Sequence, residues 1–165
     1  MANSTSTFRA IYSFGGGVTH TKSYPIASSE DWSVGSVVAW NSDGALLDPT
    51  NDTSDVLGIS LETVVSGATQ GPITDLCAVH PFQYDVVYAV KNAATLTDAP
   101  VAADIGSIHD LDLASTVWGL LIDTAATGST PQFRVVDIDT IRNEWHVVIA
   151  PLELTDVFQW IDAAV

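Results

Sequence analysis

The chain has 165 residues, 47% of them hydrophobic, and carries 20 acidic against 5 basic side chains, which gives a formal net charge of −15. This length predicts one domain, or at most two small ones, with a hydrophobic core of its own. A surface so poor in Lys and Arg repels phosphate groups, so binding to nucleic acid or to an anionic membrane is not expected. The charge suits either a salty medium or the outer face of a larger assembly.

The opening residues and the cysteine content restrict the compartment. "MANSTSTFRA" has neither the basic nor the apolar segment of a secretory signal, and no apolar run approaches the ~20 residues that span a bilayer. Cys77 is the single cysteine, which rules out an internal disulfide, and its apolar neighbours predict a buried thiol. We therefore expect a protein that is made and folded in a cytoplasm.

Residues 1–30 contain one clear strand-like stretch, "FRAIYSF" at 8–14. Its period of two places four residues on one face of a strand: Phe8, Ala10, Tyr12 and Phe14. Three glycines and a polar run follow, without continuous apolar patterning. We predict an extended N-terminal arm over residues 1–30 that holds one or two short strands.

The middle of the chain reads as short strands separated by turn residues. Residues 34–48 predict a hairpin, in which Asn41 to Gly44 form the turn and Gly44 takes the positive φ. Residues 56–65 predict a strand with a bulge or corner at Gly58. Residues 73–91 predict two strands broken near Pro81, because Val and Tyr favour β structure.

The remaining segments continue this pattern. Residues 92–114 are acidic and irregular, and "HDLDL" within them predicts a solvated strand edge, with His109 and Leu111 on one face and Asp110 on the other. Residues 115–131 predict a strand and a polar turn, and 132–151 predict a second hairpin. The last segment, 154–165, predicts a helix with an apolar stripe formed by Val157, Trp160, Ile161 and Ala164.

Many short strands with turn residues between them indicate an all-β fold, an antiparallel β-barrel or sandwich of β-tulip-like form. The predicted organisation is an arm over 1–30, a β-barrel domain over 31–151 and a C-terminal tail, helical or extended, over 152–165. No repeat of 20 to 50 residues recurs, so a solenoid is not expected.

No motif indicates catalysis. There is no G-x-S-x-G, and His80 lies three positions after Cys77, which puts the two side chains on opposite faces of a strand. Two acidic groups contain the oxygen atoms that a Ca²⁺ site requires: Asp48, Asn51, Asp52 and Asp55, and then Asp137, Asp139, Asn143 and Glu144. Neither matches the EF-hand spacing, so solvated loops are the preferred interpretation. We expect no enzyme activity, no cofactor and no metal.

Five tryptophans remain to be placed. Trp40 and Trp145 belong to the predicted hairpins and are expected in the core. For Trp32, at the end of the arm, and for Trp160 beside Phe158 in the tail, packing within the chain and packing on a partner subunit both stay open.

The predicted β-units resemble a known family. The strand "VGSVVAW", the turn "SDG" and the strand "VLGISLETVVSG", together with the later "WGLLIDTAATGSTPQFRVVDIDTIRNEWHVVIA", resemble the small β-barrel proteins that decorate or cement the heads of tailed phages. The resemblance covers roughly residues 34–150 and leaves the arm and the tail unexplained. Such a family implies no catalytic residue.

This resemblance implies a structural protein on the outer surface of an icosahedral capsid. It would form a homotrimer, bind the major capsid protein and cement neighbouring subunits, after synthesis in the host cytoplasm. Aromatic residues of the arm and tail would make the capsid or subunit contacts: Phe8, Tyr12, Trp32, Phe158 and Trp160. The alternatives are a carbohydrate- or cell-surface-binding β-module and, less favoured, a small hydrolase on a β-scaffold.

Overall fold

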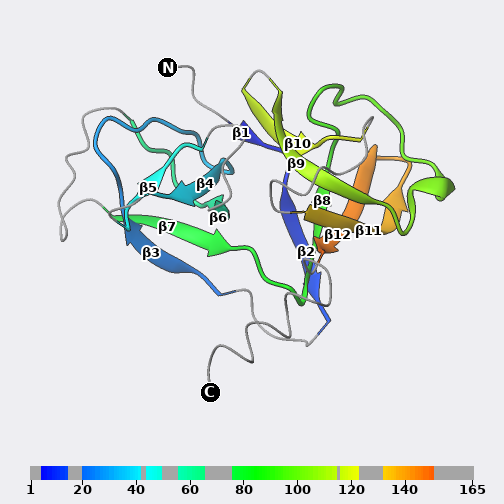
Figure 1. Ribbon diagram of the computed structural model, residues 1–165, viewed down its shortest axis with the longest axis horizontal. Helices are drawn as coiled ribbons and strands as arrows, with labels where there is room; N and C mark the ends of the chain where they lie inside the picture. Colours follow the sequence, from blue (N-terminus) through cyan, green and yellow to red (C-terminus); the bar gives the residue numbers. More distant parts are fainter. Residues whose placement is uncertain are drawn as a thin grey trace.

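A computed structural model describes residues 5–14, 20–41, 44–49, 56–65, 76–114, 116–122 and 132–150 (Figure 1). These residues form two β-sheets and one 3₁₀ turn, Ala102–Asp104. The predicted all-β class, an antiparallel barrel or sandwich, is confirmed. The expected C-terminal helix lies outside the described residues. Among those described, no helix has the length and the apolar composition needed to cross a membrane.

The larger sheet has seven strands in the order β1-β10-β9-β11-β12-β8-β2. Their bounds are β1 Thr5–Ser6, β2 Arg9–Ser13, β8 Val86–Val90, β9 Ile108–Ala114, β10 Val117–Leu120, β11 Gln132–Asp139 and β12 Glu144–Ile149. All neighbours run antiparallel except β1 and β10, which are parallel. The predicted hairpin over 132–151 is confirmed as β11 and β12.

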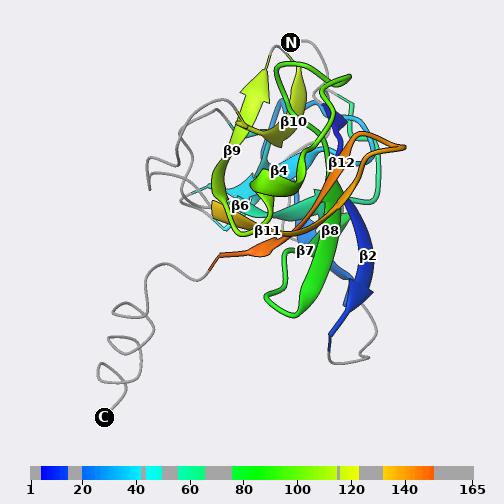
Figure 2. The ribbon, with the colours of Figure 1, turned by 90° about the vertical axis from the view of Figure 1, so that its right-hand side faces the viewer.

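The larger sheet is curled, because its two edge strands are consecutive in the chain. β1 and β2 are joined through Thr7 and Phe8, although they lie at opposite ends of the strand order. The Thr7 hydroxyl donates to the Trp118 carbonyl (3.2 Å) and accepts from the Lys91 amide (3.0 Å). A bridge from Asn92 to Leu120 also joins the residues after β8 to β10. Figure 2 shows the curl, with β9 to the left of the view and β2 to the right.

The smaller sheet has five strands in the order β3-β7-β6-β4-β5. Their bounds are β3 Lys22–Pro25, β4 Val37–Trp40, β5 Leu46–Leu47, β6 Val56–Ser60 and β7 Leu76–Pro81. The predicted hairpin over 34–48 is confirmed as β4 and β5, and Gly44 has φ +73°. The strand predicted over 56–65 ends at Ser60, and Leu61 after it is exposed.

Gly58 marks the irregularity that its position in β6 predicted. The pairing of β6 with β4 shifts register beside it, between Val38 and Ala39. A Cβ atom at Gly58 would collide with the carbonyl oxygen of His80 and lie 2.6 Å from the Cα of Pro81. Glycine is therefore required here, because the backbone of the neighbouring strand β7 lies too close to leave room for a Cβ atom.

Two hydrophobic cores hold the sheets. The main core lies inside the curled sheet and also takes Val37 and Ile59 from the smaller sheet, so it joins the two. The second core packs on the other face of the smaller sheet and surrounds Trp32, which has no exposed surface and donates its Nε1–H to the Ser60 hydroxyl (2.9 Å). Both faces of the smaller sheet are therefore covered.

The described part of residues 1–30 belongs to the fold and is not a separate arm. β1 and β2 form both edges of the larger sheet, and β3 is an edge of the smaller one. Phe8 lies in the main core, where its ring is 5.4 Å from that of Phe82 and 5.1 Å from that of Phe133. Residues 1–30 show no continuous apolar pattern in the sequence, because β2 and β3 each bury one face only in part.

The acidic segment before β10 also differs from the prediction of a solvated edge. Residues 108–114 form an internal strand, β9, between β10 and β11. Asp110, expected in solvent, is only 5% exposed and accepts a hydrogen bond from the Gln132 side chain (3.1 Å). The hydrogen bond from Gln132 on the neighbouring strand offsets part of the free energy that the burial of Asp110 costs.

Candidate interaction surface

The five predicted contact residues fall into three groups. Phe8 and Trp32 are buried, with 6% and 0% exposure, so these two side chains are held in the protein's own cores and the prediction of a partner contact is wrong for them. Tyr12 is 48% exposed, as a contact residue requires. Phe158 and Trp160 lie outside the described residues, and their role stays a prediction.

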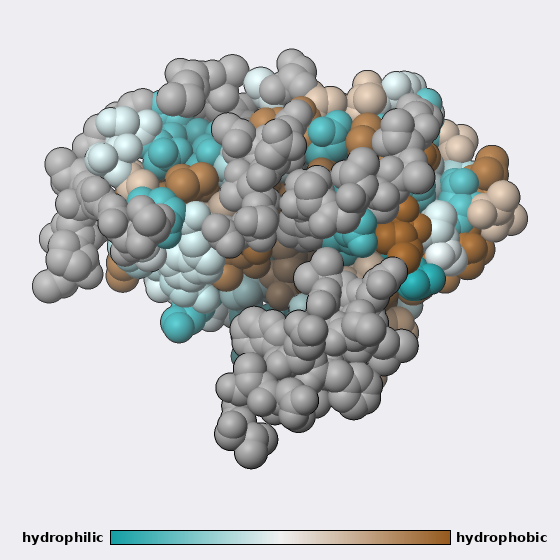
Figure 3. Space-filling view, in the orientation of Figure 1, coloured by the Kyte–Doolittle hydropathy of each residue, from teal (hydrophilic) through white to brown (hydrophobic). Residues whose placement is uncertain are grey.

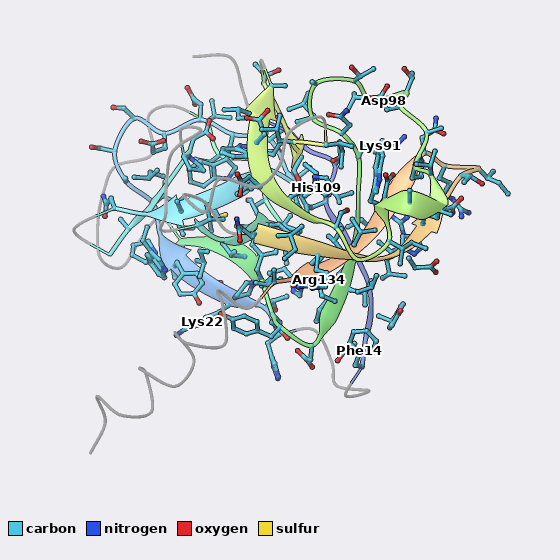
Figure 4. The ribbon with its side chains drawn as sticks, turned by 45° about the vertical axis from the view of Figure 1, so that its right-hand side comes forward. Phe14, Lys22, Lys91, Asp98, His109 and Arg134 are labelled. Atoms are coloured by element: carbon cyan, nitrogen blue, oxygen red, sulfur yellow. The ribbon has the colours of Figure 1, made fainter. Side chains whose placement is uncertain are left out.

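Tyr12 belongs to a group of exposed aromatic side chains that we call the aromatic surface: Tyr12, Phe14 and Tyr84. Phe14 is 64% exposed and Tyr84 is 72% exposed. The rings of Tyr12 and Phe14 meet edge to face with 5.6 Å between their centroids. Phe14 lies at the end of β2, at the periphery of the molecule (Figure 4).

A bulge in β2 creates this surface. The pairing of β2 with β8 shifts register between Ala10 and Tyr12, so Ile11 is an extra residue. Phe8 and Ala10 pack against the main core, whereas Tyr12 and Phe14 face solvent. The sequence pattern placed all four on one face, and that prediction is wrong because a one-residue insertion inverts the alternation after it.

Hydrogen bonds fix the turn that carries Tyr84 beside the end of β2. The Phe14 amide donates to the carbonyl of Asp85 (2.8 Å), and the Ser13 hydroxyl donates to the Asp85 carboxylate (2.7 Å). The Gln83 amide donates to the Tyr88 hydroxyl (2.9 Å). The aromatic surface therefore stands on a braced support, which lowers the entropy lost when it binds a partner.

Sequence reasoning missed Phe14 and Tyr84. Each is a large aromatic residue directly beside a turn, Phe14 before three glycines and Tyr84 after the Pro81 break. A position beside a turn does not by itself indicate exposure, because Trp40 before the Asn41–Gly44 turn and Phe82 after Pro81 pack against the cores. The sequence therefore offers no signal that separates Phe14 and Tyr84 from aromatic residues of the core.

The support beneath the aromatic surface contains a buried polar pair, His80 and Tyr88. Burial raises the pKa of Tyr88 to about 12. Burial also lowers the pKa of His80, whose Nε2 lies 3.3 Å from the Tyr88 hydroxyl oxygen. Both groups are therefore neutral at physiological pH, as burial in an apolar environment favours.

A second group of exposed apolar residues, the aliphatic surface, lies around the β11–β12 turn. Its members are Leu96, Val101, Ile105 and Ile141. The turn contacts the loop after β8 through a hydrogen bond from the Asn143 side chain to the Thr97 carbonyl (3.3 Å). Figure 3 shows hydrophobic residues at this right-hand end of the molecule. Its members are aliphatic, in contrast to the ring pair of the aromatic surface.

The acidic group at the β11–β12 hairpin has internal partners. Asp139, Glu144 and His146 bring potential metal-ligand atoms within 4.8 Å of one another. However, Asp139 pairs with Arg142 (2.8 Å), which lowers the pKa of its carboxyl, and Glu144 pairs with Arg9 (2.8 Å). These two guanidinium groups already neutralise the carboxylates, so the cluster is explained as a braced turn. Of the other acidic group, residues 51, 52 and 55 lie outside the described ranges.

The described nucleophile–base pairs are also explained structurally. Cys77 lies in the second core with its Sγ 3.2 Å from the Ser60 hydroxyl, and burial raises the pKa of its thiol. His80 contacts Tyr88 instead. Cys77 and His80 therefore lie on opposite faces of β7, as their spacing of three residues predicted. Ser107 lies 2.8 Å from Nε2 of His109, but its hydroxyl donates to the Asp104 carbonyl (2.5 Å) and ties the 3₁₀ turn to β9.

The five basic side chains form no patch. Two are in ion pairs, and Lys22 lies over the ring of Tyr24 (5.3 Å to its centroid). Lys22, Lys91 and Arg134 come from separate parts of the chain and lie well apart (Figure 4).

A scan of protein-family models and a search of curated proteins each gave no match to the chain. The established conclusion is therefore the fold: a two-sheet antiparallel β-structure that displays an aromatic surface.

Proposed function

We propose that the chain is a capsid decoration protein: a structural virion protein that binds the outer surface of an icosahedral bacteriophage capsid and cements neighbouring major capsid proteins. The single observation that carries the proposal is the aromatic surface on its braced support. Exposed, ordered aromatic side chains contribute more binding free energy than other surface residues. The class of partner comes from the sequence resemblance over residues 34–150.

The proposed mode of action is mechanical and involves no reaction. The curled sheet and the covered smaller sheet form a stiff body, and Tyr12, Phe14 and Tyr84 fasten it to the shell. Capsid stabilisation follows when each copy bridges two capsid subunits. Copies would act as homotrimers on the outer capsid surface, and Phe158 and Trp160 would add contacts from the tail. The net charge of −15 supports a partner surface that is neutral or basic.

A second candidate function is a carbohydrate- or cell-surface-binding β-module. Exposed aromatic rings such as the Tyr12–Phe14 pair can also stack on sugars. The tryptophans give this candidate less support, because Trp32, Trp118 and Trp145 are buried. A glycan array separates the two functions: binding to a defined sugar that is lost when Tyr12 is replaced would favour the second.

Co-sedimentation tests the proposed function. Natively expressed protein is run through a density gradient, and its ratio to the main shell protein is measured on a quantitative gel. The matched variants are the double variant Tyr12→Ser/Phe14→Ser and the control Ile141→Ser, which removes an apolar side chain that is 93% exposed on the aliphatic surface.

We expect wild type and Ile141→Ser to migrate with a large particle at one fixed ratio. The double variant should lose particle binding by roughly tenfold or more. A wild-type protein that stays at the top of the gradient would overturn the proposed function. Loss of binding by Ile141→Ser, with the double variant unaffected, would overturn the assignment of the aromatic surface.

A further inference from the structure

The loop between β8 and β9 is long and exposes no charged residue over most of its length. Residues 91–107 connect the two strands and contain the 3₁₀ turn. In the stretch 94–106, every exposed residue is uncharged, whereas the two acidic residues, Asp98 and Asp104, are half-buried. Connections of more than about 12 residues with so little secondary structure are uncommon and usually functional.

Both acidic side chains hold this loop in place. Asp98 accepts a hydrogen bond from the Asn92 side chain (2.6 Å), and Asp104 accepts one from the indole nitrogen of Trp145 (2.8 Å). Asp104 also accepts from the Val101 amide (2.9 Å), which braces the 3₁₀ turn. The loop therefore uses its charges internally and presents aliphatic side chains to solvent, in a chain whose net charge is −15.

The β11–β12 turn lies beside the loop and supplies the other half of the aliphatic surface (Figures 1 and 3). The Asn143 side chain joins the turn to the loop at the Thr97 carbonyl. At the tip of the turn, Ile141 is 93% exposed, and Arg142 after it pairs with Asp139 while its side chain stays 68% exposed. The tip thus presents an aliphatic side chain beside a base, and the loop presents aliphatic side chains beside two acids.

The tip and the loop are complementary in hydrophobicity and in charge. When the tip of one copy packs on the loop of another, Ile141 meets aliphatic side chains, and Arg142 approaches Asp98 or Asp104. Elsewhere the acidic surface repels a second copy. On the aliphatic surface Asp98 and Asp104 are hydrogen-bonded internally and Asp139 is paired with Arg142, so the repulsion is least there.

The size of the aliphatic surface suits a contact between copies. A stable interface takes about 800 Å² and about 20–30 residues from each partner. That area is about a tenth of the 8954 Å² that the chain exposes. Residues 94–106 and 140–142 supply most of the smaller number of residues. We therefore expect an interface at the small end of the range, with a dissociation constant on the order of micromolar.

We infer that the aliphatic surface binds other copies of this chain, with the tip of each copy on the loop of the next. A contact between two different parts of the surface generates a ring when the rotation between copies closes. A ring of three copies gives the homotrimer of the proposed function, and only this copy number rests on that proposal. The aromatic surface stays available to a shell, because Phe14 lies well away from Asp98 (Figure 4).

Sedimentation equilibrium of the full chain tests the inference, with the molar mass measured between about 1 and about 100 μM. Val101→Asp places a charge on the loop, at the N-cap of the 3₁₀ turn, where Asp is favoured. Ile141→Asp places one on the tip. The matched control is Val34→Asp, because Val34 is 59% exposed and Val101 is 56% exposed. Circular dichroism checks that all three variants fold as wild type does.

We expect the wild type to approach about 52 kDa at the highest concentration, three times the 17.5 kDa of one chain. Val101→Asp and Ile141→Asp should each raise the dissociation constant roughly tenfold or more, because each buries a carboxylate among aliphatic side chains of an acidic partner. Val34→Asp should leave it within about twofold. Added NaCl should lower the wild-type constant by screening the repulsion between copies.

Two results would overturn the inference: a wild type that keeps the mass of one chain at every concentration, or a control that dissociates as far as Val101→Asp does. A mass of two chains that Val101→Asp reduces to one would support the contact and overturn the ring of three.

Co-sedimentation separates the inference from the proposed function. A copy that loses the contact keeps its own aromatic surface, so Val101→Asp, like Ile141→Ser, should still migrate with the particle. Self-association of the wild type without co-sedimentation would retain the contact between copies and reject the capsid role. Co-sedimentation without self-association would do the reverse.

Discussion

The Nε2 atom of His80 lies 3.3 Å from the hydroxyl oxygen of Tyr88, and this contact joins β7 of the smaller sheet to β8 of the larger one. The two rings also pack with 5.9 Å between their centroids. The link is polar and buried. It joins the two strands on either side of the β7–β8 connection, which carries Tyr84. It therefore couples the protonation of one histidine to the packing of the two sheets.

Acid should weaken the protein through His80. Burial lowers the pKa of His80 below 6.5, so the folded state binds fewer protons than the unfolded state. Neutral His80 makes its full contribution to the free energy of unfolding above the pKa that it has in the unfolded state. This contribution is lost as the pH falls from there through the lower pKa of His80 in the folded state. We expect His80→Gln to flatten the fall in thermal midpoint between about pH 7 and about pH 5, measured by circular dichroism. The control, His20→Gln, changes an exposed side chain and retains the backbone group of His20 that hydrogen-bonds to His80, so it should keep the wild-type slope.

Replacement of Phe8 and of Tyr12 should separate core from surface within one short segment. Phe8→Ala removes a ring that contacts Phe82, Phe133 and Tyr88, and should lower the free energy of unfolding by about 3–5 kcal/mol. Tyr12→Ala should change it by less than about 1 kcal/mol. Urea unfolding measures both. Equal effects would contradict the inversion of faces at the β2 bulge.

Closure of the curled sheet should depend on Gly119 in β10. A Cβ atom there would lie 2.5 Å from the carbonyl oxygen of Lys91 and 2.9 Å from the amide nitrogen of Ala93. We expect Gly119→Ala to destabilise the protein by about 2 kcal/mol or more, since β8 and β10 must separate. Gly44→Asn is the control, because its site is open and Asn tolerates a positive φ. A near-neutral Gly119→Ala in urea unfolding would show that the closure is loose.

Cys77 should be chemically inert in the folded protein. Its side chain has no exposed surface, and burial raises the pKa of its thiol. A chromogenic disulfide reagent at pH 8 should therefore react with it at the rate of unfolding and rapidly only in denaturant. Fast reaction in native buffer would place the thiol at the surface and contradict the second core.

Salt should stabilise the protein. With 20 acidic and 5 basic side chains, repulsion within the folded state outweighs the two Arg–carboxylate pairs, which are exposed and weak. Raising NaCl from about 0.1 to about 1 M shortens the screening length from about 10 to about 3 Å, so the thermal midpoint should rise. An uncharged osmolyte at matched osmolality is the control, and a midpoint that falls in NaCl would mean that attractive pairs dominate.

The sequence predicted what is locally encoded. Residues 34–48 and 132–151 contain strands and their own turn, so each hairpin could be identified without knowledge of the rest. The positive φ of Gly44 follows from the same local chemistry. The all-β class follows from the sum of such units.

The sequence could not reveal what depends on distant partners. Residues 5–13 look like an arm because their pairing partners, β10 and β8, lie far along the chain. The bulge at Ile11 has no sequence signal, and it decides whether Tyr12 and Phe14 face the core or the solvent. Asp110 is buried because Gln132 on a later strand donates to it. Of the interaction surface, Tyr12 alone could be named in advance.

The pairing of β1 and β2 also determines when the protein can fold during synthesis. Thr7 emerges early from the ribosome, yet its partners lie 84 positions later, at Lys91, and 111 positions later, at Trp118. At about 5–20 residues per second, the N-terminal strands wait roughly 4 to 22 seconds for the rest of their sheet. The smaller sheet, whose strands β3 to β7 are contiguous in the chain, is made complete first. Translation therefore completes the strands of the smaller sheet before the Thr7 contacts that close the larger sheet can form.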